Sequence, residues 1–167
     1  LINQVFLSPL KESVLVNLDL LRFLCLGKTF RIHSKQQGFP DLEKIQIAIF
    51  GIEEGRNSEN NSGCGDNLHF IRTKLYELYP GKWTTQIADI GDVLKGDSVT
   101  DTYFAVSEII ADLLKKNITP IIIGGGHDLT YANYRAYDSL EQTVNIASVD
   151  NRFDIGNLND QLTSRSY

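Results

Sequence analysis

Short β-branched runs alternate with segments of helical periodicity along this chain, and this alternation constrains its fold more than any other feature. The predicted strands are residues 44–52, 84–90, 120–123 and 144–149, and the predicted helices are residues 12–26, 67–79, 98–117 and 129–137. The connections are short, which favours right-handed parallel crossovers. We therefore predict an α/β fold in three α/β/α layers, with an open and mainly parallel sheet.

Two of the predicted helices begin at residues that are suited to capping. Ser98 is followed three residues later by Asp101, which resembles a capping box. Asp128 could cap the helix over 129–137 in the same way. Tyr103 has the spacing of the apolar stripe of the helix that Ser98 opens.

Length and composition indicate one domain over residues 1–167, with a helical lead-in over 1–43. The formal charge of −5 argues against nucleic-acid binding, because phosphates would remain unneutralised. No apolar run approaches the roughly 20 residues that span a bilayer, so we expect no membrane segment. Cys25 and Cys64 form no CxxC motif, which is typical of a reducing compartment and predicts a cytoplasmic protein.

One predicted strand end carries Gly124-Gly125-Gly126-His127 directly after the apolar run. Glycines allow the backbone to turn sharply, so His127 is expected to project from the strand end, where parallel sheets bind ligands. A tight turn with a packed histidine is an equal alternative. A phosphate-binding loop is a weaker alternative, because the residues match neither GxGxxG nor GxxxxGK[ST].

The last predicted strand ends in Asp150, Arg152 and Asp154, which share one face if the backbone stays extended. Two carboxylates beside His127 favour a hard divalent cation such as Mn²⁺ or Mg²⁺. Taken alone, these three residues are more typical of an Asp–Arg–Asp salt-bridge ladder.

Together, these stretches resemble the ureohydrolases, the family of arginase, agmatinase and formiminoglutamase. Residues 124–127 are similar to the family's Gly-Gly-x-His motif. Asp150 and Asp154 match the two carboxylates of its Asp-x-His-x-Asp motif, and residues 65–72 are similar to its Gly-Pro-x-x-Ile-Arg helix entry. The resemblance covers residues 44–160. It implies an arginase-like fold, of which this chain is an incomplete portion, and a homo-oligomer.

The resemblance also implies a chemistry. Family members hold two Mn²⁺ ions, which activate a bridging water to hydrolyse C–N bonds of small guanidino or formimino compounds. By position, His127, Asp150 and Asp154 would ligate the first Mn²⁺, and Asp150 would bridge to the second.

The chain departs from the family pattern at Arg152, which stands in place of the central histidine. Arginine stays protonated and offers no acceptor, so it cannot ligate a cation. We expect an impaired or absent dinuclear centre, with the Arg152 guanidinium neutralising both aspartates. The alternative is an active hydrolase with a mononuclear or altered centre, and a phosphate- or nucleotide-binding domain is a distant third.

Glu53, Glu54 and Arg56 follow the first predicted core strand, where the resemblance places residues near the substrate. For each of them, a solvated polar loop is the more frequent alternative. His33 lies in a basic, polar stretch, which predicts an exposed side chain.

Overall fold

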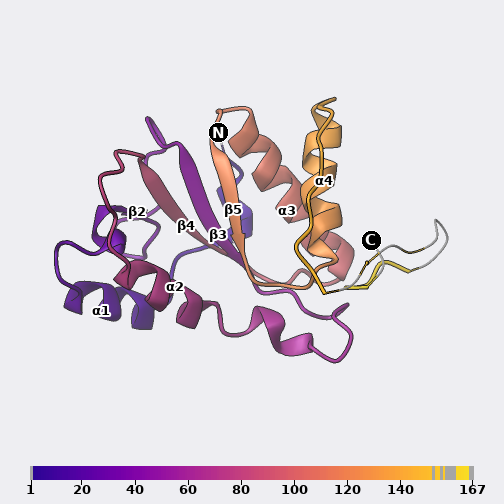
Figure 1. The fold of residues 1–167 in the computed structure, drawn as a ribbon, viewed down its shortest axis with the longest axis horizontal. Coiled ribbons are helices and arrows are strands. Elements are labelled where there is room, and N and C mark those ends of the chain that lie inside the picture. The colour runs from indigo at the N-terminus through magenta and orange to yellow at the C-terminus, as the bar shows by residue number, and fades with distance from the viewer. Residues whose placement is uncertain (1, 152, 155, 157–160, 166–167) are drawn as a thin grey trace.

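The computed structural model describes residues 2–151, 153–154, 156 and 161–165, and they form three layers (Figure 1). The sheet lies between two pairs of helices. One face carries α1 (Glu12–Leu20) and α2 (Leu68–Glu77), and the other carries α3 (Val99–Leu114) and α4 (Leu129–Ser139). The predicted α/β/α architecture is therefore confirmed.

The sheet is mixed but mostly parallel. β3 (Ile47–Ile52) is central and pairs in parallel with β4 (Ile87–Val93) and with β5 (Thr119–Ile123). On the far side of β4, the short β1 (Leu7–Ser8) pairs antiparallel and β2 (Arg31–Ile32) pairs parallel. Three short 3₁₀ helices complete the described elements: Gln4–Phe6, Leu26–Thr29 and Ser62–Gly65.

The strand order explains why helices cover both faces. The chain passes from β3 through α2 to β4, then returns through α3 to β5 on the opposite side of β3. Right-handed crossovers in opposite directions place α2 and α3 on opposite faces of the sheet. The order therefore reverses between β3 and β5, and ligands of open α/β sheets bind outside the carboxyl ends of strands at such a reversal.

The core explains the apolar character of β3. Phe50 and Ile52 pack in the cluster that includes α3 and α4, whereas Ile49 packs with Leu68 of α2 on the other face. A strand covered on both faces is apolar along its whole length. The capping box of α3 is also confirmed, because Ser98 Oγ accepts from the Asp101 backbone N–H at 3.2 Å.

Four predictions about local structure are wrong. The helix predicted over residues 12–26 ends at Leu20. Residues 144–149 are not a strand, and Val149 is fully exposed. No described residue pairs with this segment, and an extended chain becomes a strand only when a neighbour satisfies its backbone groups. Asp128 makes no capping hydrogen bond to α4. His33 is buried, and its Nδ1 donates to the Ile90 carbonyl at 3.0 Å.

None of the helices that the structure describes combines the length and the apolar character that a membrane crossing requires.

Candidate metal centre

The turn after β5 presents His127 at the carboxyl edge of the sheet. Gly124 and Gly125 both have positive φ, at 75° and 83°, which non-glycine residues rarely adopt. The Gly126 N–H donates to the carbonyl of Glu54, in the loop after β3, at 3.0 Å. The turn therefore lies against the end of β3, at the point where the strand order reverses.

His127 meets both predicted aspartates. Its Nδ1 is 3.0 Å from Asp150 Oδ2 and 3.3 Å from Asp154 Oδ2. The three side chains offer ligand atoms that all lie within 4.8 Å of one another. The histidine side chain is 56% exposed, whereas that of Asp154 is only 3% exposed. Arg152 lies outside the described residues.

This donor set fits a divalent cation. Imidazole nitrogen and carboxylate oxygen are ligands that Mn²⁺ and related ions accept. Asp154 Oδ1 is buried and has no hydrogen-bond partner among the described residues. A buried carboxylate oxygen normally has a partner, so this atom is suited to coordination.

A cavity of about 300 Å³ opens beside these ligands. The loop after β3 contributes Ser58 and Cys64, the turn after β5 contributes His127, and the segment near the C-terminus contributes Asp150 and Asp154. Three segments that are distant in sequence therefore meet at one small site.

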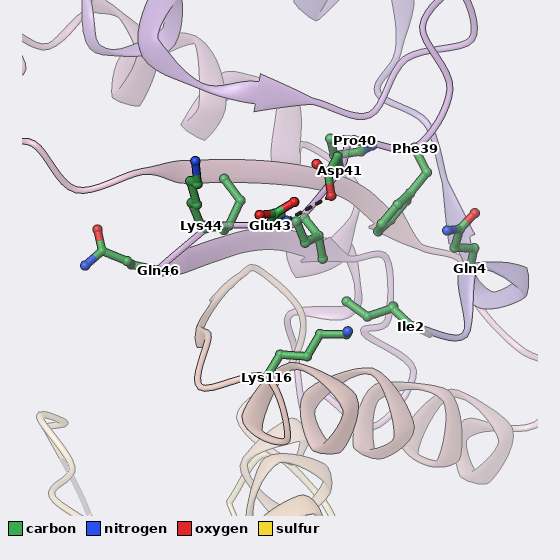
Figure 2. A pocket seen from close by; sticks show the side chains of 11 residues that line it. Ile2, Gln4, Phe39, Pro40, Asp41, Glu43, Lys44, Gln46 and Lys116 are labelled. Carbon is green, nitrogen blue, oxygen red and sulfur yellow. Dashed lines mark hydrogen bonds between the residues drawn. The ribbon is translucent and has the colours of Figure 1, made fainter.

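A larger cavity of about 780 Å³ lies at the other end of the sheet (Figure 2). Its lining includes Lys44 and Gln46, which precede β3, and Lys116, which precedes β5. It therefore adjoins the amino ends of the parallel strands, away from the ends at which such sheets bind ligands.

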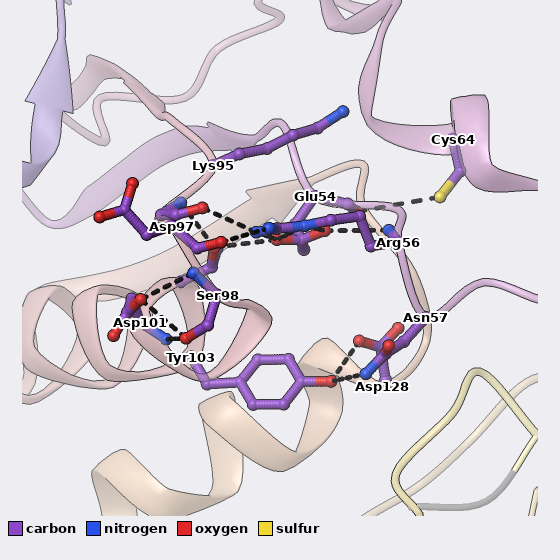
Figure 3. Close-up of polar contacts among 12 residues, drawn as sticks. Glu54, Arg56, Asn57, Cys64, Lys95, Asp97, Ser98, Asp101, Tyr103 and Asp128 are labelled. Atoms are coloured by element: carbon purple, nitrogen blue, oxygen red, sulfur yellow. Dashed lines mark hydrogen bonds and ion pairs between the residues drawn. The ribbon is translucent and has the colours of Figure 1, made fainter.

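Glu54 and Arg56 form an ion pair instead of a solvated loop (Figure 3). Arg56 Nη2 donates to Glu54 Oε2 at 2.6 Å, and its guanidinium also donates to the carbonyls of Gly96 and Asp97. Burial favours a raised pKa for the fully buried Glu54, but hydrogen bonds from Arg56 and Thr102 outweigh it and lower that pKa.

Neither Glu54 nor Arg56 lines the cavity beside His127. Glu53 does not line it either, and pairs with Lys11 at 2.8 Å. The structure thus brings together the three predicted metal ligands but places the three predicted substrate-loop residues in contacts that join loops.

A buried charge cluster between α2 and β4 was not predicted from the sequence. Arg72 Nε is 2.8 Å from Asp89 Oδ2, and its Nη1 is 2.7 Å from Asp92 Oδ1. The Tyr76 hydroxyl also donates to Asp89, at 2.7 Å. Asp89 and Asp92 lie inside the otherwise apolar β4. Because buried carboxylates require a partner, these two residues could have indicated a buried cation.

Comparison with known proteins gives a consistent result. The model of the Arginase family matches residues 45–165. A formimidoylglutamase of Macrococcus caseolyticus is 29% identical over 119 residues, which are 68% of this chain and 38% of that protein.

Two solved structures share the fold. Formimidoylglutamase from Bacillus subtilis matches with a TM-score of 0.64 at 18% identity, over 77% of this chain and 44% of that one. A hypothetical agmatinase from Burkholderia thailandensis matches with a TM-score of 0.66 at 18% identity, over 86% of this chain and 47% of that one. The chain spans less than half the length of each of these matched proteins.

Proposed function

The chain belongs to the arginase family, and from this premise we propose that His127, Asp150 and Asp154 bind one divalent cation of the Mn²⁺ class. The site would serve the hydrolysis of a C–N bond in a small formimino or guanidino compound. One observation carries the proposal: ligand atoms of three side chains, from the turn after β5 and from a segment more than 20 residues further along the chain, lie within 4.8 Å of one another.

Each ligand side chain contributes differently. Asp154 is buried, so the position of its carboxylate would be fixed, and its Oδ1, which has no hydrogen-bond partner among the described residues, leaves an acceptor available. His127 is more exposed and would face incoming solvent and substrate. When bound, the cation would act as a Lewis acid and lower the pKa of a coordinated water. A cavity of about 300 Å³ suits a small substrate.

A formimino compound is the first substrate to test. Several curated relatives are formimidoylglutamases, including those from Macrococcus caseolyticus and Geobacillus. A guanidino compound is the second, because a hypothetical agmatinase shares the fold.

We place the number of bound cations at one because of Arg152. The family motif has a histidine at this position, and a protonated guanidinium neither ligates a cation nor favours one nearby. Arg152→His should therefore add Mn²⁺ affinity, and an unchanged affinity would contradict the assignment.

Two alternatives remain as outcomes of the same measurements. In the first, Arg152 neutralises both aspartates and no metal binds, so the protein would be a non-catalytic relative. The second is a phosphate-binding turn at Gly124–Gly126. The carboxylates of Asp150 and Asp154 in the cavity disfavour it, because they repel an anion.

Titration of the full chain with Mn²⁺, followed by the electron paramagnetic resonance signal of free Mn²⁺, tests the proposal. Changes in the outer shell of a metal site cost about 10–100-fold in affinity, so His127→Ala and Asp154→Asn should cost at least as much. His69→Ala is the matched control, since His69 lies on α2 outside the cavity lining. Absence of binding by the parent, or parent-like binding by both ligand variants, would contradict the proposal.

A further inference from the structure

We infer that Tyr103 is a positioning residue for His127, which it holds through Asp128, the next residue in the chain. The expected effect on Mn²⁺ affinity rests on the proposed function. The expected effect on the order of the turn that carries His127 rests on geometry alone. Tyr103 lies near the N-terminus of α3 and does not line the cavity itself.

The contact is a buried hydrogen bond between Tyr103 of α3 and the residue that directly precedes α4 (Figure 3). The Tyr103 hydroxyl donates to Asp128 Oδ2 at 2.5 Å, and Asn57 Nδ2 donates to the same hydroxyl at 3.0 Å. Asp128 is 1% exposed. Burial, reinforced by Asp128, raises the pKa of Tyr103, so the phenol keeps its proton and remains a donor.

Little else holds the Asp128 carboxylate. Its Oδ1 has no hydrogen-bond partner among the described residues, and the side chain does not cap α4. A buried carboxylate is stabilised mainly by the hydrogen bonds that it accepts. The phenol is therefore the main side-chain restraint on Asp128 in the part of the chain that the structure describes.

The Asp128 carboxylate also packs against the backbone of the turn on the other side of His127. A Cβ atom at Gly126 would collide with Asp128 Oδ1 and with Ser58 Oγ. The carboxylate thus occupies the space that a side chain at Gly126 would need. Residues on both sides of His127 are consequently fixed by the position of one carboxylate.

Two consecutive residues of α3, Thr102 and Tyr103, connect this helix to the loop after β3 and to the turn after β5. Thr102 Oγ1 donates to Glu54 Oε2 at 2.9 Å, and the carbonyl of Glu54 accepts from the Gly126 N–H. Tyr103 holds Asp128 on the other side of the turn. Helix α3 therefore sets where His127 stands relative to Asp150 and Asp154.

Tyr103→Phe removes the hydroxyl and keeps the ring, so it tests the inference with little change in packing. We expect the dissociation constant for Mn²⁺ to rise about tenfold, as for other outer-shell partners of metal-bound histidines. Tyr131→Phe is the matched control, because the Tyr131 ring packs edge-on against Tyr103 with centroids 6.0 Å apart and its hydroxyl does not contact Asp128. This control should bind Mn²⁺ like the parent.

A second measurement needs no metal. Amide hydrogen exchange in the metal-free protein should be faster over residues 126–130 in Tyr103→Phe than in the parent, and unchanged in Tyr131→Phe. Exchange in Tyr103→Phe equal to that in the parent would overturn the inference. If the parent binds Mn²⁺, an equal Mn²⁺ affinity of Tyr103→Phe would overturn it as well. If the parent binds no Mn²⁺, the proposed function fails, and the exchange comparison alone decides whether Tyr103 holds the turn.

Discussion

At the scale of single residues, Arg72 has the largest expected effect on stability. It is 1% exposed, and its guanidinium compensates Asp89 and Asp92 together. Removing the cation from a buried pair costs about 3–5 kcal/mol, because the carboxylates stay buried without compensation. Arg72→Met should lower the free energy of unfolding by about this amount in urea titrations.

The control for this prediction lies on the same helix. Lys74 pairs with Glu77 at 2.9 Å, but both side chains are exposed. Exposed pairs contribute about 0–1 kcal/mol, so Lys74→Met should change stability little. A loss for Arg72→Met as small as that for Lys74→Met would show that the buried cluster does not stabilise the fold.

Glu54 gives stability a dependence on pH. Its pKa is lower in the folded state than the usual 4.5, because hydrogen bonds from Arg56 and Thr102 outweigh burial. The folded state therefore favours the ionised form, and this contribution is present above about pH 4.5 and is lost as the pH falls through the lower, folded-state pKa.

Urea midpoints measured from pH 7 to pH 3 test this prediction. Glu54→Gln should be less stable than the parent at pH 7 and should lose less stability on acidification. Glu77→Gln, on the exposed face of α2, should follow the parent curve. A Glu54→Gln curve parallel to that of the parent would contradict the assignment.

The sequence predicts the candidate metal ligands, but it does not predict the residue that positions His127. His127, Asp150 and Asp154 could be predicted as ligands because their motifs resemble those of the ureohydrolases, whereas the residue types alone left a packed histidine and a salt-bridge ladder open. Tyr103 could not, since its spacing is that of an apolar stripe and its partner lies 25 residues away. The basic neighbours of His33 wrongly indicated exposure, because tertiary packing decides burial.

At the scale of elements, the N-terminus of α3 has structural and functional importance. Ser98 and Asp101 form a complete capping box there, and Thr102 and Tyr103 follow directly after Asp101. Loss of an N-cap serine costs about 1 kcal/mol. Ser98→Ala should lower the free energy of unfolding by this amount in urea titrations, whereas Thr100→Ala, at an exposed position of the same turn, should not. Equal effects would contradict the role of the cap.

The elements themselves were largely predictable because their signals are local. Apolar periodicity identified α2, α3, α4 and the three long strands, although β4 begins three residues later than predicted. Residues 144–149 have the same kind of apolar run and yet are not a strand. Strand formation depends on a neighbour, and the sequence of the segment does not reveal whether one is present.

At the scale of the whole molecule, the order of strands determines where the site lies. Because the order reverses between β3 and β5, the loop after β3 lies beside the turn after β5, and both line the cavity. This order could not be predicted, because it depends on pairing between residues that are distant in sequence. The family resemblance supplied the expected architecture. The two matched solved structures confirm that architecture, and the match covers less than half the length of each of them.

The central claim is that one divalent cation binds at His127, Asp150 and Asp154. The most direct test is the Mn²⁺ content of the full chain after equilibrium dialysis at a saturating Mn²⁺ concentration, measured by elemental analysis beside His127→Ala. One equivalent in the parent and none in the variant is the predicted result. No bound Mn²⁺ in the parent, or the same content in both proteins, would contradict the claim.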